Sequence, residues 1–498
     1  MKPSLPTASL RAVGIAFATA TLALAGCASG PDFKPPSPPT VSGYVAQLPT
    51  TTTSTSGVAG GAAQHFAADA DIAGDWWTLF HSKPLDALVA RALENNHDLK
   101  AAQAALRIAH EDVLAQRGTF FPSVSAGFSA SREQDPSAAL APVPSNNAYL
   151  YSLFTPQLAI SYTPDLFGLN RRTRESLEAQ EQAVRFQMIA AWTTLTSNVV
   201  VTAVEEAALR GEVDATRKSI AIAKKSLAIL QLRSRKGDAS KLDVAAQQSQ
   251  LAQIEAGLPE LVKQLAATRH ALAVLVGAFP DQAPAETFTL ASLHLPENLP
   301  LSLPSKLVSQ RPDVRQARAN LHAASAAIGI AAAERLPQFQ LTADAGSTAL
   351  AISNVFASGT GFWGIAASLV APIFEGGQLM HQERAAKAAY VEAAEQYRGT
   401  VLTAFQNVAD TLVALDQDAR GLQAAATAEH AAQTTLDLSQ LQSRHGYIGT
   451  FELLAAEQSY QQAKIALVQA EANRFADTAA LYQALGGGWW HDKDLAKQ

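Results

Sequence analysis

Cysteine is nearly absent from this sequence. A single one, Cys27, occurs in 498 residues, which excludes a disulfide framework and a metal site built from several cysteines. Aromatic residues are also few, at 7%, whereas alanine is abundant. Alanine buries little surface per side chain but is the best helix former, so the composition favours long, closely packed helices over one thick globular core. The net charge of −6 argues against nucleic acid as a partner.

Motifs that carry catalysis or bind nucleotides and metals are missing as well. The segment GTGFWG, residues 359–364, has the spacing G-x-G-x-x-G, but no strand pattern precedes it and no helix pattern opens from it. The sequence has no phosphate-loop lysine motif and no paired-histidine zinc motif, and its 11 histidines are scattered. We therefore predict a protein that is not an enzyme, with no catalytic residues, no metal and no dissociable cofactor.

Proline is lacking from two long segments. None occurs between Pro164 and Pro259, and none occurs after Pro372. Because proline disrupts the interior of a helix, each segment has room for one very long helix, predicted at 170–235 and at 378–444. Apolar residues recur in both at the heptad-like spacing of a coiled coil.

The chain begins with a basic and then apolar segment. Lys2 and Arg11 precede the run AVGIAFATATLALAGC, which is too short for a good membrane-spanning helix and typical of a secretory signal peptide. Its end, LAGC, resembles a bacterial lipobox. We therefore predict that residues 1–26 are removed and that Cys27 carries a covalent lipid; the alternative is a buried lone cysteine. Ala28, where an aspartate would suggest retention in the inner membrane, implies by the same resemblance that the protein goes to the outer membrane.

The rest of the chain contains one unit twice. Residues 97–128 align with 312–346, and further on Gly237 falls on Gly446 at a constant shift of 209 residues. This period is far too long for a solenoid repeat, so a duplicated unit is the better interpretation. Each unit is expected to hold a medium helix, two strands, a very long helix, a break at the glycine, and a final helix.

This order predicts a division of the chain. In sequence we expect a signal peptide at 1–26, a lipid-anchored extended segment at 27–74, a first repeat at 75–277, a proline-rich linker at 278–305, a second repeat at 306–488 and a tail at 489–498. The medium helices are predicted at 97–119 and 312–334, the final helices at 241–276 and 450–485, and the strands at about 121–133, 150–164, 337–346 and 362–371.

The predicted strands alternate between apolar and polar residues. In QFQLTADAG, for example, Phe339, Leu341 and Ala343 point to one side, and Gln340 and Thr342 to the other. This alternation is typical of a transmembrane β-strand with a lipid face and a lumen face, although half-buried strands of a soluble sheet are the alternative. An open sheet edge is not tolerated in hydrocarbon, and the smallest bacterial barrels have about eight strands. Four strands per chain therefore require two or three chains.

Several segments in a fixed order carry a family resemblance. With LAGCASGPDFKPP, DWWTLF, RPDVRQA, PIFEGGQL and YQALGGGW, the chain resembles the TolC-like outer membrane factors, in their OprM/NodT lipoprotein branch. The resemblance implies a mainly α fold with membrane β-strands: a homotrimer whose 12-strand β-barrel continues into a periplasmic α-helical barrel.

The resemblance also implies a function. The protein would be the outer-membrane channel of a tripartite, RND-type efflux pump, a passive duct for drugs and other toxic small molecules. Its partners would be a periplasmic adaptor protein, an inner-membrane transporter and outer-membrane lipid. Two alternatives stay open: the exit channel of a type I protein secretion system, and a trimeric coiled-coil envelope scaffold without a pore.

The breaks between the paired helices are the candidate sites. Their glycines are typical helix C-caps. The resemblance adds adaptor docking at two tips, Lys236-Gly237-Asp238 and His445-Gly446-Tyr447. It also nominates Phe451 and Glu452 for the ring that closes the periplasmic mouth, with Asp243 at the matching place in the first repeat. Ser240 and Asp243 also fit a capping box. Arg235 and Arg444 are a possible latch of the mouth, or plain helix C-terminal charges.

Overall fold

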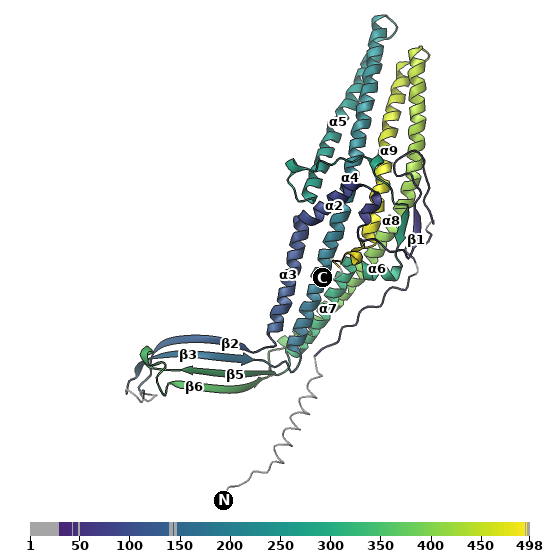
Figure 1. Ribbon diagram of the computed structural model, residues 1–498. Coiled ribbons are helices and arrows are strands. Elements are labelled where there is room, and N and C mark those ends of the chain that lie inside the picture. Colours follow the sequence, from purple (N-terminus) through teal and green to yellow (C-terminus); the bar gives the residue numbers. More distant parts are fainter. Residues whose placement is uncertain are drawn as a thin grey trace. The chain divides into compact units, whose positions relative to one another are not determined.

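The computed structural model describes residues 29–41, 43–47, 50–138, 143, 147–493 and 495 (Figure 1). The predicted signal peptide and Cys27 lie outside these residues. Contacts divide the chain into two compact units. The first contains the described residues of Met1–Pro36 together with Arg107–Ala183 and Ala317–Tyr397. The second contains those of Ser37–Leu106, Val184–Gln316 and Arg398–Gln498.

Two pairs of helices with matching lengths dominate the chain. Helices α4 (Leu169–Arg235) and α8 (Gln378–Arg444) have 67 residues each. Helices α5 (Lys241–Leu275) and α9 (Thr450–Ala484) have 35 each. Every bound lies within one residue of the sequence prediction. Among the described residues, no helix is both long enough and apolar enough to cross a membrane.

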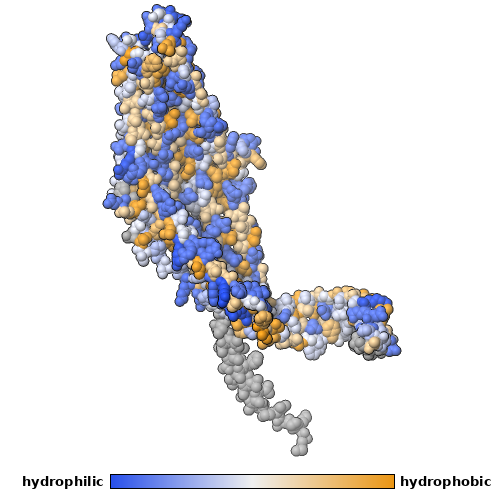
Figure 2. Space-filling model, turned by 180° about the vertical axis from the view of Figure 1, so that it is seen from behind, coloured by the Kyte–Doolittle hydropathy of each residue, from blue (hydrophilic) through white to orange (hydrophobic). Residues whose placement is uncertain are grey.

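Shorter helices fill in the repeat. The medium helices are α3 (His97–Gly118) and α7 (Pro312–Ala333), with 22 residues each. Helices α2 (Lys83–Asn95) and α6 (Pro304–Gln310) precede them and both begin with a proline in the first turn, where its missing N–H costs nothing. Short 3₁₀ turns occur at Trp76–Phe80, Pro280–Gln282, Leu290–Ser292, Ile352–Asn354 and Trp489–His491. In Figure 2 hydrophilic and hydrophobic residues are interspersed over the visible helical surface.

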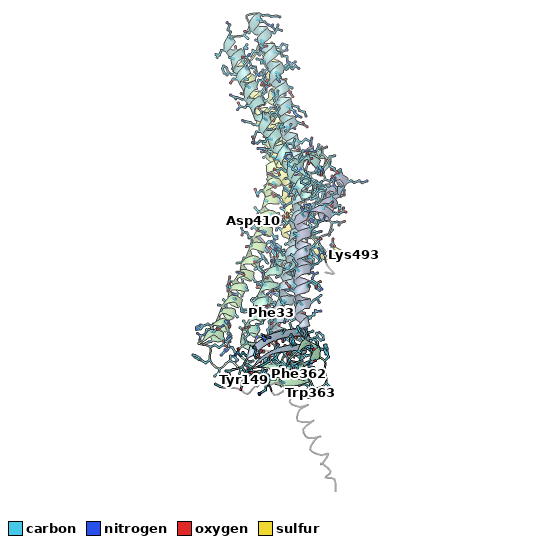
Figure 3. All side chains as sticks on the ribbon, turned by 90° about the vertical axis from the view of Figure 1, so that its left-hand side faces the viewer. Phe33, Tyr149, Phe362, Trp363, Asp410 and Lys493 are labelled. Atoms are coloured by element: carbon cyan, nitrogen blue, oxygen red, sulfur yellow. The ribbon has the colours of Figure 1, made fainter. Side chains whose placement is uncertain are left out.

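The first unit contains a four-stranded antiparallel sheet. Its strands are β2 (Ser123–Gln134), β3 (Leu150–Tyr162), β5 (Gln338–Ser347) and β6 (Gly361–Val370), in the order β2-β3-β5-β6. The central pair therefore joins the first repeat to the second. Figure 3 shows Phe362 and Trp363 on this sheet.

The register of the sheet collects the apolar residues on one face. Ala343 stands between Ile160 and Ile365, and Ala345 stands between Leu158 and Trp363. Because side chains alternate along a strand, the polar residues of all four strands meet on the opposite face. The apolar face is open in the single chain, where 77% of Ile365 is exposed.

The second unit has a core of aromatic residues. Trp76 is fully buried and stacks on Tyr482 with 5.0 Å between ring centroids. Trp77 packs against Trp192 at 5.9 Å. Gly488 has φ of 71°, and a Cβ there would come within 2.3 Å of the Ala73 carbonyl oxygen. The segments DWWTLF and YQALGGGW thus contribute residues to this core.

The N-terminal segment is more closely packed than its composition predicts. Residues 28–70 lack the pattern of a core, yet β1 (His65–Ala68) pairs in parallel with β4 (Asn298–Leu301), a strand inside the predicted linker. The buried guanidinium of Arg474 on α9 donates to the carbonyl oxygens of Gly60 and Ala62. Side-chain hydrogen bonds to a backbone leave no periodic signal, so composition alone does not predict this contact.

Candidate functional site

The two helix hairpins of the second unit turn in the same way. Gly237 follows α4 with φ of 86°, and Gly446 follows α8 with φ of 77°. The N–H of Asp238 donates to the Arg233 carbonyl at 2.9 Å, and the N–H of Tyr447 donates to the Gln442 carbonyl at the same distance. This is the Schellman arrangement, whose left-handed position glycine occupies without strain. The shared break in the two repeats is a shared helix C-cap.

The residues predicted to dock an adaptor lie at the hairpin tips. Lys236, Gly237 and Asp238 are exposed, and so are His445, Gly446 and Tyr447. The rings of His445 and Tyr447 stack with centroids 6.0 Å apart, and 80% of Tyr447 is exposed. In the single chain the first tip therefore presents charged groups to solvent, and the second presents two aromatic rings.

The helices that follow the tips begin differently. In the first hairpin Ser240 and Asp243 form a reciprocal capping box, with the Asp243 N–H donating to Ser240 Oγ at 3.1 Å. Hydrogen bonds from the Ser240 hydroxyl and backbone hold the pKa of the Asp243 carboxyl below its ordinary value. In the second hairpin the N-cap is Gly449, which has no side chain to cap the helix. A Cβ placed at Gly449 would lie 2.8 Å from Glu452 Oε2. The predicted mouth residue Asp243 is thus engaged in capping.

Phe451 and Glu452 occupy the first turn of α9. Both are exposed in the single chain, Phe451 to 64%. Neither side chain is buried within one chain. The position matches Leu242 and Asp243 of the first hairpin, since the repeats are shifted by 209 residues.

Arg233 forms a hydrogen bond that joins the two hairpins near their tips. Arg233 Nη1 on α4 donates to the Ser443 carbonyl on α8 at 3.0 Å. The predicted latch residues Arg235 and Arg444 are exposed, and neither forms an ion pair among the residues that the structure describes. The sequence did not predict this role for Arg233. Arg233 and Arg235 both lie in the last turn of α4, and only the tertiary structure shows which of them faces α8.

Deeper between the hairpins lies a buried polar cluster. Glu457 on α9 is 4% exposed and accepts hydrogen bonds from Ser226 Oγ on α4 and, at 3.1 Å, from Gln247 Nε2 on α5. The other amide atom of Gln247, Oε1, is buried without a hydrogen-bond partner. A glutamate in a helix of mixed composition gives no sequence signal of burial, so this cluster was not predicted.

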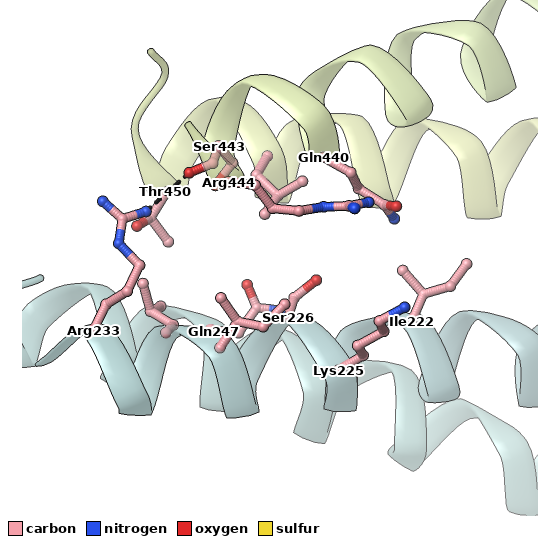
Figure 4. A pocket seen from close by; sticks show the side chains of 12 residues that line it. Ile222, Lys225, Ser226, Arg233, Gln247, Gln440, Ser443, Arg444 and Thr450 are labelled. Atoms are coloured by element: carbon pink, nitrogen blue, oxygen red, sulfur yellow. Dashed lines mark hydrogen bonds between the residues drawn. The ribbon is translucent and has the colours of Figure 1, made fainter. Parts of the chain in front are cut away.

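A cavity of about 130 Å³ lies beside this cluster, between the hairpins (Figure 4). Its lining comes from α4, α5, α8 and α9: Ile222, Lys225, Ser226, Ile229, Leu230, Arg233, Gln247, Gln440, Ser443, Arg444, Thr450 and Leu453.

A separate contact in the first unit holds the residues that follow Cys27. The guanidinium of Arg172 on α4, 4% exposed, donates to the Ser29 carbonyl at 2.9 Å and to the Gly30 carbonyl at 3.3 Å. It also pairs with Asp32 at 2.9 Å and with Glu175 at 2.7 Å. One buried arginine thus ties the start of the described chain to α4.

Sequence comparison gives a consistent family. The family model described as outer membrane efflux protein matches residues 88–278 and 303–487. The chain is 30% identical over 424 residues to the pyoverdine export outer membrane protein OpmQ of Pseudomonas putida, covering 84% of this chain and 88% of OpmQ. It is 29% identical over 497 residues to the toluene efflux pump outer membrane protein TtgC of the same species, covering 97% of both.

Structural comparison agrees. The outer-membrane channel OprN superposes with a TM-score of 0.82 at 25% identity, covering 93% of this chain and 100% of OprN. The MtrE outer membrane channel of Neisseria gonorrhoeae superposes with a TM-score of 0.77 at 26% identity, covering 93% and 98%. The predicted fold class is confirmed: a homotrimeric channel with two repeats, membrane strands and long helices.

These findings confirm the predicted efflux function and the predicted outer-membrane location. The protein is an outer-membrane channel component of a tripartite efflux pump, reaches into the periplasm, and works with an adaptor and an inner-membrane transporter. As a channel it is a passive duct and not an enzyme. By the extent of both matches, the chain belongs to the outer membrane efflux protein family.

Proposed function

We propose that this protein is the lipid-anchored exit duct of its pump for small organic molecules, and that it is closed at its hairpin tips. The observation that carries the duct is the four-stranded sheet. Its apolar face is continuous, and within the described chain β2 and β6 pair on one side only. Since unpaired edges are not tolerated in hydrocarbon, several chains must join their sheets around a lumen.

The proposed cargo is taken from the functions of the relatives. OpmQ exports pyoverdine and TtgC belongs to a toluene efflux pump. Both cargoes are small organic compounds. We propose the same class for this duct.

The tips are proposed as the adaptor contact. Lys236-Gly237-Asp238 and His445-Gly446-Tyr447 are exposed, adjacent to the helix ends, and held in one backbone conformation by the Schellman bonds. A partner would therefore meet two preformed turns of similar shape with different side chains.

The mouth is proposed to close at Phe451 and Glu452, with Asp243 nearby. Three copies of an exposed glutamate near a common axis would repel one another and attract cations. Arg235 and Arg444 are proposed as latch residues between chains, because neither has an ion-pair partner in the described part of one chain. The Arg233–Ser443 bond would restrain the same movement within a chain.

The lipid anchor is proposed at Cys27. Arg172 fixes Ser29 and Gly30 against α4, two and three residues beyond the lipidated sulfur. A lipid on Cys27 would therefore enter the membrane from a defined place beside the first unit. The same proposal makes 1–26 the cleaved signal peptide and 27–74 the anchored segment.

The remaining divisions are also proposals. The two matched ranges of the family model, 88–278 and 303–487, support repeats at 75–277 and 306–488. Residues 278–305 would then be the linker and 489–498 the tail.

Deletion of the gene is the test of the duct. We expect a deletion strain to become severalfold more susceptible to lipophilic antibiotics and organic solvents, because the pump loses its exit, and complementation to restore resistance. Unchanged susceptibility with loss of secreted protein would instead support a type I secretion channel. Absence of ionic current from the purified oligomer in a planar bilayer would support a scaffold without a pore.

Replacing Cys27 with serine tests the anchor. We expect Cys27→Ser to abolish incorporation of radiolabelled palmitate, because the sulfur is the attachment point of the lipid. Ser29→Ala is the matched control, since Arg172 contacts the carbonyl of this residue and not its side chain, and we expect it to keep the label. Label retained in the serine variant would contradict the assignment.

A further inference from the structure

We propose that the cavity between the two hairpins is a binding site for a small amphipathic organic acid. Its carboxylate would lie between Lys225 and Arg444, and its apolar body would fill the space between the helices. Its walls are the facing sides of the two hairpins of one chain.

The charge of the lining is the first argument. Three lining residues are cationic, Lys225, Arg233 and Arg444, and none of the twelve is acidic. Figure 4 shows Arg444 on the wall formed by α8 and Lys225 on the opposite wall. Neither residue forms an ion pair among the described residues, whereas the neighbouring Lys224 pairs with Glu255 at 2.8 Å. Cations that face each other across a gap repel, and an anion between them removes that repulsion.

The nearby carboxylates do not pair with Lys225 or Arg444. The Asp243 carboxylate interacts electrostatically with Arg233, but it accepts a hydrogen bond from the Ser240 hydroxyl. Glu457 lies behind the cavity wall and is bonded to Ser226 and Gln247. Both acids are therefore held by their own hydrogen bonds. Within the described part of one chain, Lys225 and Arg444 are the lining cations left without a carboxylate.

A buried acceptor is the second, independent argument. Gln247 is 0% exposed and lines the cavity, and its Oε1 has no hydrogen-bond partner. Leaving a buried acceptor unpaired costs the free energy of its lost hydration. A ligand hydroxyl donating to Gln247 Oε1 would satisfy it. A matching ligand therefore has an anionic group at one end and a hydrogen-bond donor at another position.

Apolar side chains complete the lining. Ile222, Ile229, Leu230 and Leu453 contribute from both hairpins. A pocket with apolar walls and a few placed polar groups is the usual form of a small-molecule site. At about 130 Å³ the space suits a ligand with a single small ring.

A bound acid would touch both hairpins at once. It would add contacts across the seam that Arg233 and Glu457 already bridge, and so favour the closed spacing of the tips. This consequence for gating rests on the proposed mouth at Phe451 and Glu452. The binding site itself does not.

The test uses purified full-length protein in detergent and 4-hydroxybenzoate, which carries a carboxylate, one ring and a hydroxyl donor. Calorimetric titration is expected to show saturable binding at one site per chain. The neutral amide, 4-hydroxybenzamide, should bind at least about tenfold more weakly, as should 4-hydroxybenzoate to Lys225→Gln or Arg444→Gln, because each change removes a charged hydrogen bond. Lys224→Gln is the matched control and should bind as the unaltered protein does.

Two further variants separate binding from fold and from gating. Leu453→Trp fills the cavity and keeps all three cations, so it should abolish binding without altering the circular dichroism spectrum. In planar bilayers 4-hydroxybenzoate should lower the open fraction of the unaltered channel but not of Leu453→Trp. Absence of saturable binding, or equal affinity for the amide or for the two charge variants, would overturn the site. A channel that conducts but binds no acid leaves the duct intact and refutes only this inference.

Discussion

Replacing Ile365 with arginine is expected to abolish the folded trimer in the outer membrane. Ile365 lies in the middle of β6, on the apolar face, opposite Ala343. A charged residue on the lipid face near the bilayer midplane costs about 2–4 kcal/mol per strand, and the trimer would incur this cost three times. The measurement is the amount of heat-modifiable oligomer in outer-membrane fractions on gels.

The neighbouring residue provides the control. Ala366 follows Ile365, pairs with Thr342 and lies on the polar face, which is assigned to the lumen. Ala366→Arg adds the same charge to the same strand but leaves it in water, so we expect near-normal amounts of trimer. Loss of trimer in Ala366→Arg alone would show that the two faces are wrongly assigned. Equal loss in both variants would show that the effect does not depend on the face, and equal retention would show that β6 does not contact lipid.

Opening of the periplasmic mouth is the second large effect. We expect Phe451→Ala and Glu452→Ala each to raise single-channel conductance severalfold in planar bilayers. Removing three phenyl rings widens the constriction. Removing three glutamate side chains widens it as well. Because the negative charge of the ring is also lost, Glu452→Ala should reduce preference for cations, whereas Phe451→Ala should not.

The first hairpin supplies the matched control for the mouth. Leu242 occupies the place of Phe451 in the other repeat and is exposed to a similar degree, 67% against 64%. If the second hairpin alone forms the constriction, Leu242→Ala leaves conductance unchanged. Unchanged conductance in both α9 variants would refute the assignment of Phe451 and Glu452, and an equal rise in Leu242→Ala would extend the ring to both hairpins.

Local sequence determined the elements of this protein. The long helices follow from the absence of proline, and their ends at Gly237 and Gly446 follow from the need for a left-handed residue at a helix C-cap. The strand faces follow from alternation with a period of two. The capping box follows from the spacing of three residues between Ser240 and Asp243. Each signal lies within a few residues of the feature that it predicts.

Tertiary structure alone decided which side chains meet across the repeats. Arg233 and Arg235 are alike in sequence, but Arg233 reaches Ser443 because of the side of α4 that faces α8. Glu457 is buried and bonded because α9 turns it toward Gln247. Arg172 holds Ser29 from more than a hundred residues away. These contacts join residues distant in the chain, and a helix period fixes a stripe of positions without saying which partner the stripe will face.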